Sequence, residues 1–447
     1  MKSGDVLIKA WEETLARKGD SAAIFDTRGA VSLTFREIEE QARMFEQKFG
    51  ASDPGRVNAI QIGNHPDWPA TFIASLRKRL PVLPLDKSVS AQERDNAIAI
   101  CNKGAETDWN GRPPTFFKLT SGTTAEPRLI RFRSEQLLAD CDNICETMGI
   151  TGADRNFAVI PLSHSYGFSN LITPLIARGV PMVLSSDPMP RAILHDLEKT
   201  GATIFPGMPL LYQACCELEK IPALDRLRLC ISAGAPLSAD VARRFSEKFR
   251  RPIHSFYGSS ECGGICYDRE GDTVADGFVG TAMNGLTIDI LEPAAEASQV
   301  RVRSAAVGDG YFPQPNEEKL GRGFFIPDDL LRKTERGFRV VGRVSDVINV
   351  AGKKVNPVEI EAELLCCTGV KQAIVFGRES SLRNQEVVAC VVGGPGLTES
   401  SVLEFCRRRL SGWRAPKQIF LVAEIPVNER GKISRRELAQ KFATEKA

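Results

Sequence analysis

A cluster of hydroxyl side chains and glycine interrupts an apolar run near residue 120. The run FFKL at 116–119 is followed by Thr120, Ser121, Gly122, Thr123 and Thr124. Hydroxyl groups donate hydrogen bonds, and glycine lets backbone N–H groups approach a ligand closely. The loop therefore suits phosphate oxygens. Since Ser, Thr and Gly are also common in turns, a polar hairpin turn is the alternative for the loop taken alone.

Three further motifs follow this loop: YGSSECGG at 257–264, GRVSDVINVAGKKVNPVEIE at 342–361 and ERGKISRREL at 429–438. The ordered set resembles the adenylate-forming (AMP-binding) superfamily, which includes acyl-CoA synthetases, peptide-synthetase adenylation domains and beetle luciferases. The resemblance runs from about residue 5 to about residue 440. Four separated motifs in one order are far more specific than any single motif. The resemblance implies an enzyme that uses ATP to activate a carboxylic acid as an acyl-AMP.

The resemblance assigns phosphate binding to the hydroxyl loop. Residues 120–124 would hold the β- and γ-phosphates of ATP, and Arg128 stands where the family usually has lysine. Arginine keeps the positive charge and adds a fork of donors, so we expect function to survive. Ala125 replaces the usual glycine of this loop.

The YGSSE segment supplies the predicted contacts to adenine, α-phosphate and metal. By resemblance, Tyr257 and Gly258 lie at the adenine, Ser260 bonds the α-phosphate in place of the usual threonine, and Glu261 holds Mg²⁺. A hard cation needs such an oxygen ligand. The segment that packs beside the adenine would be Gly234, Ala235 and Pro236. Taken alone, these two segments read as a turn after a strand and as a helix entry.

Three charged residues complete the predicted site. Asp329 falls where the family's acid binds both ribose hydroxyls, but Pro327 and Asp328 replace the Thr and Gly that normally precede it, so Asp328 is a possible substitute. Arg343 would contact the ribose and phosphate side, with a surface ion pair as its alternative role. Lys432 resembles the mobile catalytic lysine that bridges the carboxylate and the α-phosphate; its alternative role is a solvated lysine before a basic helix.

The residues around His164 bear on the substrate. The resemblance places His164, in PLSHSYGFSN, as a catalytic residue at the wall between the acyl pocket and the adenylate. Relatives that activate amino acids carry an aspartate in this stretch, whereas Ser163, His164 and Ser165 offer no charge. We therefore expect a fatty or aryl acid without an α-ammonium group. Coenzyme A is the first expected thiol acceptor, and the phosphopantetheine of a separate carrier protein is the second.

Strand and helix patterns alternate along most of the chain, which is typical of α/β architecture. Because ligands collect at the carboxyl ends of the strands in such sheets, His164, Gly234 and Tyr257 are expected around one crevice. Short strands after Gly277 (VRVRS, GYFP and GFRVVGR) predict a small β-rich subdomain before residue 343. Only 33 residues separate Asp86 from Thr120, fewer than in the family, so a strand and helix are expected to be missing there.

The fold class expected is α/β: a large N-terminal AMP-binding domain at 1–343 that includes the β-rich subdomain, and a small mobile α+β domain at 346–447 that carries the catalytic lysine. Ser345, two residues after Arg343, would be the hinge between them. Hinges absorb large backbone changes, and small side chains make that easier.

Composition limits the partners and the location. The formal charge of +2 offers no global field for nucleic acid or an anionic membrane, and no apolar run is long enough to span a bilayer. A cytoplasmic enzyme is expected. The twelve cysteines show no zinc-ligand spacing and are expected to be reduced, most of them as small core residues. Two other functions remain open: a binding-only descendant, and a luciferase-like oxidation of the adenylate.

Overall fold

The computed structural model describes residues 4–49, 56–105, 113–120, 128–380, 384–426 and 435–442. The chain divides into two compact units. The first unit comprises Met1–Leu291, Val300–Pro327 and Lys333–Arg339; the second comprises Glu292–Gln299, Asp328–Arg332 and Val340–Ala447. Within the described ranges, no helix has the length and apolar character that crossing a membrane requires.

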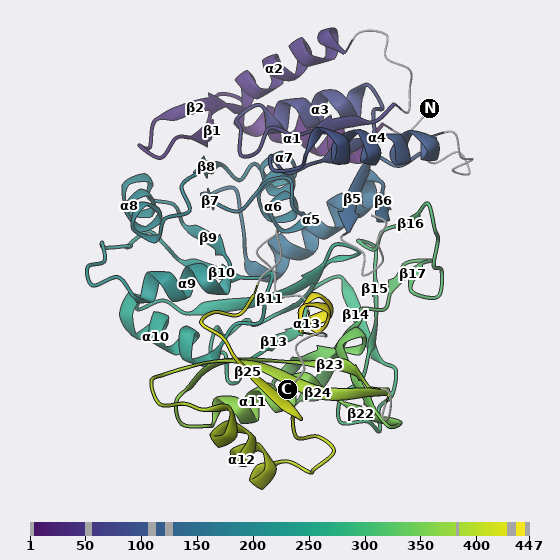
Figure 1. The fold of residues 1–447 in the computed structure, drawn as a ribbon. Helices are drawn as coiled ribbons and strands as arrows, with labels where there is room; N and C mark the ends of the chain where they lie inside the picture. The colour runs from purple at the N-terminus through teal and green to yellow at the C-terminus, as the bar shows by residue number, and fades with distance from the viewer. Residues whose placement is uncertain are drawn as a thin grey trace. The chain divides into compact units, whose positions relative to one another are not determined.

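A large sheet (Figure 1) has the order β19-β20-β13-β12-β11-β10-β9-β7-β8-β1-β2, where β19 is Asp329–Thr334. Six neighbouring strands are parallel: β11 (Ile253–Ser259), β10 (Leu229–Ser232), β9 (Ile204–Gly207), β7 (Asn156–Ala158), β8 (Met182–Leu184) and β1 (Ala22–Phe25). Antiparallel strands extend both ends: β2 (Val31–Thr34) on one, and β12 (Gly263–Tyr267), β13 (Phe278–Ala282) and β20 (Gly337–Arg343) on the other.

Helices cover both faces of the parallel strands. On one face α8 (Pro190–Thr200), α9 (Pro209–Cys216) and α10 (Ala239–Phe249) link successive strands. In α10 the apolar residues Val241, Phe245 and Phe249 recur every four positions and pack into one core with the strands. On the other face, α5 (Ser134–Met148) and α7 (Thr173–Arg178) pack against the strands in a second apolar core. Buried apolar strands with helices on both sides are what a parallel sheet requires, which confirms the predicted α/β class.

The remaining helices of the first unit lie before β5 or between β7 and α7. They are α1 (Val6–Lys18), α2 (Phe35–Lys48), α3 (Trp68–Arg77), α4 (Ala91–Ala105), α6 (Ser165–Gly167) and the π-helix η1 (Phe168–Ile172). A capping box begins α2, where Thr34 and Glu37 satisfy each other's backbone N–H groups. Trp11 of α1 donates to the buried carboxylate of Glu39 on α2 (2.9 Å), which ties these two helices together.

A second sheet has the order β16-β6-β5-β4-β3. Its strands are β3 (Asn58–Ile60), β4 (Val82–Pro84), β5 (Phe116–Thr120), β6 (Arg128–Phe132) and β16 (Gly310–Phe312). The first three are parallel, and β5 pairs antiparallel with β6, with Thr120 opposite Arg128. The predicted phosphate loop therefore connects the two strands of a hairpin. Helix α4 and strand β5 occupy the shortened segment between Asp86 and Thr120.

A third, four-stranded sheet corrects one prediction. It contains β14 (Leu286–Ile290), β15 (Val300–Ser304), β18 (Phe324–Phe325) and β17 (Leu320–Gly321). Of the three segments expected in one β-rich subdomain, only VRVRS (β15) belongs to this sheet. GYFP contributes β16 to β6, and GFRVVGR contributes β20 to β13. Each of these two strands instead pairs with the open edge of another sheet, where unpaired backbone groups need partners.

The second unit has the predicted α+β character. Four strands pair in the order β22-β21-β24-β23, and β25 runs parallel to β24. The strands are β21 (Ile348–Val350), β22 (Lys353–Val355), β23 (Val370–Ser380), β24 (Asn384–Gly393) and β25 (Gln418–Leu421). The helices are α11 (Pro357–Leu365), α12 (Glu399–Arg409), α13 (Arg435–Lys441) and the 3₁₀ turn η2 (Val344–Asp346). The hairpin of β19 (Asp329–Thr334) and β20 joins the units along the chain.

All twelve cysteines are free thiols, and eleven of them are buried. Cys141, Cys230 and Cys390, for example, lie in apolar cores. This confirms the prediction that most of the cysteines are small core residues, with the exposed Cys366 as the exception. Burial also raises the pKa of Cys262 to about 12, so this thiol stays protonated and unreactive at neutral pH.

Candidate active site

The carboxyl ends of three parallel strands bring predicted residues together on the first unit. His164 lies beyond β7, Gly234 follows β10, and Tyr257 lies near the end of β11. The Oγ atoms of Ser165 and Ser260 are 3.1 Å apart, and the hydroxyl of Tyr166 donates to the carbonyl of Ile231 on β10 (3.1 Å). The segments around His164 and Ser260 are thus in direct contact, as expected for segments that follow the carboxyl ends of strands in one sheet.

The YGSSECGG segment forms a tight turn between β11 and β12. A register shift separates Tyr257 from Gly258, and a Cβ atom at Gly258 would lie 2.6 Å from the carbonyl oxygen of Gly263. Only glycine fits this close approach of two backbones. The turn carries Ser260 and the half-buried Glu261 at its tip.

Glu261 is held by one residue of β16 and by one residue that lies just before this strand. The hydroxyl of Tyr311 donates to Oε1 of Glu261 (3.0 Å), and the N–H of Gly308 donates to the Glu261 carbonyl (2.9 Å). Burial raises the pKa of the Glu261 carboxyl, and the Tyr311 hydrogen bond opposes that rise. A carboxylate has about four acceptor positions, so oxygen positions remain for a hard cation beside the one that Tyr311 occupies.

Arg128 lies next to the same tyrosine. Its guanidinium carbon is 5.8 Å from the centre of the Tyr311 ring. A planar cation over an aromatic face at this distance is attracted by the ring electrons. Residues 121–127, including Ser121, Gly122, Thr123 and Thr124, lie outside the described residues, as does the side chain of Thr120. Their predicted phosphate contacts therefore stay predictions.

Two buried charges behind the turn were not predicted. Oδ1 of Asp140, on α5, accepts the N–H of Gly264 (3.0 Å), and this side chain is buried. Lys118, on β5, is also buried; burial lowers its pKa, and attraction by Asp140 opposes this. The sequence did carry a signal for Asp140, because it is a carboxylate on the apolar face formed by Leu137, Cys141 and Ile144. Lys118 likewise interrupts the apolar run FFKL.

His164 has an acidic neighbour that lies far away in the sequence. Its Nε2 atom is 3.8 Å from Oδ2 of Asp86. Burial favours the neutral form of Asp86, but hydrogen bonds from Ser88 and attraction by His164 outweigh it and lower the Asp86 pKa. The prediction of an uncharged acyl pocket considered only residues 163–165, and Asp86 lies outside that segment. Negative charge is therefore present beside His164, although not within its own motif.

The segment after β10 has the geometry expected of a close-approach turn. Gly234 adopts a left-handed conformation (φ +86°), and Gly234, Ala235 and Pro236 are all exposed. Ser238 begins α10 as its N-cap, since its side chain accepts the N–H of Asp240. These residues can present backbone groups to a ligand without a steric barrier.

The second unit holds a separate group of predicted residues. Nε of Arg343 donates to Oδ1 of Asp329 (2.7 Å), so the two predicted ribose residues form an ion pair. Asp328 is adjacent, and its carbonyl accepts the N–H of Val344. Asp328 and Asp329 thus lie side by side at this ion pair, as their adjacent positions require.

The expected hinge residue is exposed and lies next to a partly buried ion-pair network. Ser345 lies in η2, and the next residue, Asp346, accepts a hydrogen bond from Arg435 (2.6 Å). Arg435 also donates to both carboxylate oxygens of Glu361 on α11. Lys432 lies outside the described residues, so its catalytic role stays a prediction.

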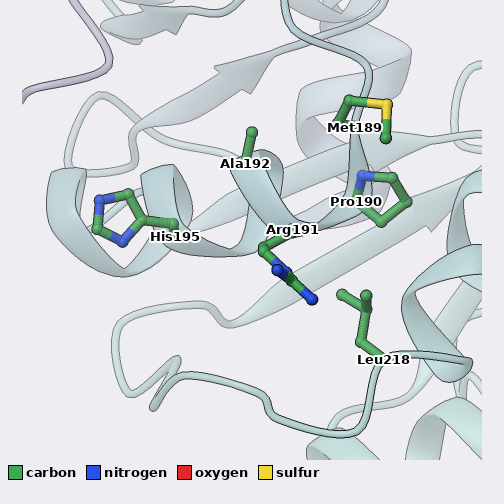
Figure 2. A pocket seen from close by; sticks show the side chains of 6 residues that line it. All are labelled: Met189, Pro190, Arg191, Ala192, His195 and Leu218. Carbon is green, nitrogen blue, oxygen red and sulfur yellow. The ribbon is translucent and has the colours of Figure 1, made fainter.

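A surface hollow of about 670 Å³ lies at the start of α8 (Figure 2). Figure 2 shows Arg191 extending toward Leu218 across it. The lining residues are Met189, Pro190, Arg191, Ala192, His195 and Leu218. None of them is a predicted site residue, so this hollow is distinct from the residue groups described above.

Comparisons with known proteins agree with the motifs. The family model described as "AMP-binding enzyme" matches residues 102–312, and the model "AMP-binding enzyme C-terminal domain" matches residues 359–432, together more than half of the chain. An oxalate–CoA ligase of Arabidopsis thaliana is 27% identical, over 96% of this chain and 97% of the relative. A 3,4-dihydroxybenzoate–[aryl-carrier protein] ligase of Bacillus anthracis is 26% identical, over 79% and 82%. A probable CoA ligase of Humulus lupulus is 28% identical, and the match spans 66% of its length.

Solved structures share the fold. ATP-bound MatB from Rhodopseudomonas palustris superimposes with a TM-score of 0.84 at 22% identity, covering 98% of this chain and 99% of that chain. The o-succinylbenzoate CoA synthetase of Bacillus subtilis gives a TM-score of 0.81 at 20% identity, covering 96% and 97%. The chain therefore belongs to the adenylate-forming superfamily, the AMP-forming ligases that activate a carboxylic acid as an acyl-AMP.

Proposed function

We propose that this protein converts a fatty or aryl carboxylic acid into an acyl-AMP with release of pyrophosphate, and then transfers the acyl group to the thiol of coenzyme A. The observation that carries this proposal is the convergence of the segments containing His164, Gly234 and Glu261 at the carboxyl ends of three parallel strands. Attack of a carboxylate on the α-phosphate builds up negative charge, and preorganised cations and donors stabilise such charge.

The proposed roles follow the two units. On the first unit, residues 120–124 and Arg128 bind the β- and γ-phosphates, Tyr257 and the segment 234–236 contact the adenine, and Ser260 bonds the α-phosphate. On the second unit, Asp329 and Arg343 bind the ribose, and Lys432 bridges the carboxylate and the α-phosphate. The functional boundary proposed lies after Arg343, although the compact second unit also contains Asp329 and Arg343. It separates a large domain at 1–343 from a mobile domain at 346–447, with Ser345 as the pivot. The Asp329–Arg343 ion pair supports the ribose assignment, since it orients the acceptor.

Glu261 is the proposed Mg²⁺ ligand. Its carboxylate is half-buried and supplies oxygen, the ligand atom that Mg²⁺ prefers. Mg²⁺ usually keeps several waters and is shared between one or two carboxylates and substrate phosphates. This fits the described residues, among which no group of three or more His, Cys, Asp or Glu side chains forms a metal site. The bound ion would neutralise charge on the phosphates.

The acid specificity is supported by the absence of a carboxylate in the 163–165 segment. The Asp86 carboxylate beside His164 makes an acid with a positively charged group a specific second candidate. The thiol acceptor also has a second candidate, since the 26%-identical relative from Bacillus anthracis acts on an aryl-carrier protein. A separate carrier protein bearing phosphopantetheine would present the same thiol chemistry as coenzyme A.

Pyrophosphate release across a panel of acids tests the proposal. The panel contains fatty acids of several lengths, aryl acids, dicarboxylic acids and amino acids, each with coenzyme A, with a phosphopantetheinylated carrier protein, or with neither. The expected result is release that depends on a fatty or aryl acid, with a thioester formed only when coenzyme A is present. Release that depends on an amino acid would assign the Asp86 carboxylate to substrate binding. ATP binding without release for any acid would point to a binding-only protein.

A further inference from the structure

We propose that Tyr311 is a positioning residue that holds the Glu261 carboxylate and the Arg128 guanidinium at a fixed separation, so that one Mg²⁺–polyphosphate ligand meets both. This inference rests on the proposed function for the identity of the ligand. Tyr311 belongs to none of the motifs that define the site, and it is not itself expected to touch the nucleotide.

The contacts of Tyr311 reach both predicted residues at once. Its ring face lies 5.8 Å from the guanidinium carbon of Arg128, and its hydroxyl donates to Oε1 of Glu261 at 3.0 Å. The side chain is 5% exposed, so it moves little in solvent. Arg128 and Glu261 are 133 positions apart in the sequence, yet this single side chain contacts both.

The strand that carries Tyr311 is itself held from several sides. In the register of β16 and β6, Tyr311 lies opposite Ile130, two residues after Arg128. Just before it, Asp309 accepts two hydrogen bonds from Arg133 (2.8 and 2.9 Å) and one from Gln136 (2.8 Å).

The residues just before β16 also anchor the backbone of the turn that carries Glu261. The N–H of Gly308 donates a hydrogen bond to the Glu261 carbonyl (2.9 Å). Glu261 is therefore fixed at its backbone and at its side chain by one short segment. Because its strand is held in place by these contacts, Tyr311 can fix the separation between the Glu261 carboxylate and the Arg128 guanidinium.

This geometry has a chemical consequence for a Mg²⁺–nucleotide ligand. The cation and the phosphates of such a ligand have a fixed separation, so a carboxylate for the cation and a guanidinium for the phosphates must be spaced to match. Tyr311 can set this spacing because its hydroxyl orients the Glu261 carboxylate and its ring orients the Arg128 guanidinium. Loss of the hydroxyl should affect only the metal-dependent part of binding.

Calorimetric titration with ATP, in the absence of any carboxylic acid, separates these parts. In Tyr311→Phe, ATP affinity at saturating Mg²⁺ is expected to fall about ten- to a hundredfold, the range that corresponds to losing one hydrogen bond to a charged group. ATP affinity in EDTA is expected to stay at the wild-type value, since the ring still supports Arg128. In Tyr311→Leu, which also removes the ring, affinity is expected to fall under both conditions.

Two controls distinguish positioning from general destabilisation. Tyr212→Phe removes another buried hydroxyl, one that donates to the carbonyls of Phe205 and Ile231, and should leave ATP affinity unchanged. In a Glu261→Gln background, Tyr311→Phe should cause no further loss of Mg²⁺-dependent affinity. Circular dichroism checks that each variant is folded.

The outcomes separate this inference from the proposed function. If folded Tyr311→Phe gives the wild-type curve in Mg²⁺, or loses as much affinity in EDTA as in Mg²⁺, the positioning role is wrong. Failure of the wild-type protein to bind ATP overturns it as well, since the ligand is then misassigned. Wild-type binding of ATP without pyrophosphate release for any acid refutes only the proposed function, because the calorimetric comparison needs no turnover.

Discussion

Replacement of Gly263 by alanine tests how tightly the turn at 258–264, which carries Glu261, is held. Gly263 has a φ of +71°, and a Cβ atom there would lie 2.0 Å from Oδ1 and 2.2 Å from Cγ of Asp140. No real Cβ contact is this short, so the alanine methyl must displace the buried Asp140 carboxylate. The displaced carboxylate can no longer accept the N–H of Gly264, which it now does at 3.0 Å.

The expected loss of stability has two parts. A residue with a Cβ in the left-handed region costs about 1–2 kcal/mol, and the loss of a hydrogen bond to a charged group costs about 1.5–3 kcal/mol. Gly263→Ala should therefore lower the free energy of unfolding of the first unit by roughly 3–5 kcal/mol. ATP binding at saturating Mg²⁺ should weaken too, because Glu261 lies two residues before the substituted position.

Gly149→Ala is the matched control. Gly149 ends α5 with a φ of +62°, and a Cβ atom there would have no neighbour within 4 Å. It should show only the cost of the left-handed conformation, about 1–2 kcal/mol. Urea titrations measure both variants, with the two compact units fitted as separate transitions because multidomain chains need not unfold in one step.

The difference in stability between Gly263→Ala and Gly149→Ala decides whether Asp140 constrains the turn. If Gly263→Ala destabilises the protein no more than Gly149→Ala does, the contact between residue 263 and Asp140 does not constrain the turn. A second check uses Asp140→Ala, which removes the atoms that the methyl would meet. The double variant should then be less destabilised than the sum of the two single variants, because residues in contact are not additive.

Three further predictions address Lys432 as the proposed catalytic lysine, Ser345 as the proposed hinge, and the pH dependence of stability. Lys432→Ala should lose about a hundredfold in adenylate formation while converting supplied acyl-AMP to thioester at near the wild-type rate; equal loss of both half-reactions in a folded variant would exclude the assigned role. Ser345→Pro should keep single-turnover pyrophosphate release and abolish thioester formation, since proline fixes φ near −65° and restricts Val344; wild-type rates for both steps would mean that Ser345 is not the pivot. Asp154 accepts hydrogen bonds from Arg228 (2.7 Å) and Thr203 (2.9 Å), and these outweigh burial and lower its pKa, so its stabilising effect is present above the unfolded value near 4 and is lost as pH falls through the folded pKa. Asp154→Asn should therefore destabilise the protein by about 2 kcal/mol at pH 7 and by progressively less in urea titrations below pH 4; a difference that does not change with pH would contradict this.

The family and the fold class could be predicted from the sequence because their signals are local. A motif such as GRVSDVINVAGKK keeps its residue types and spacing wherever it lies, and strand or helix periodicity is visible within a short window. The α/β class, the buried cysteines and the meeting of the His164 and Ser260 segments were all predicted in this way. The last of these needed only the rule that ligand-binding segments of a parallel sheet collect at the carboxyl ends of its strands.

Which strand pairs with which was decided by the tertiary structure. The segment GYFP was expected in a separate β-rich subdomain, but it pairs with β6 and so brings Tyr311 to Arg128 and Glu261. A three-residue strand has too few side chains to specify its partner, and its backbone groups can pair with any open sheet edge.

The same reason explains the unpredicted charges around the candidate site. Asp86 lies beside His164, and Asp140 holds the turn after Glu261, because folding brings together elements that are far apart in the chain. Chemical type can be read from the sequence residue by residue, whereas the neighbours that orient a side chain are set by packing between elements. The sequence therefore determined which residues could do the chemistry, and the tertiary structure determined which residues hold them in place.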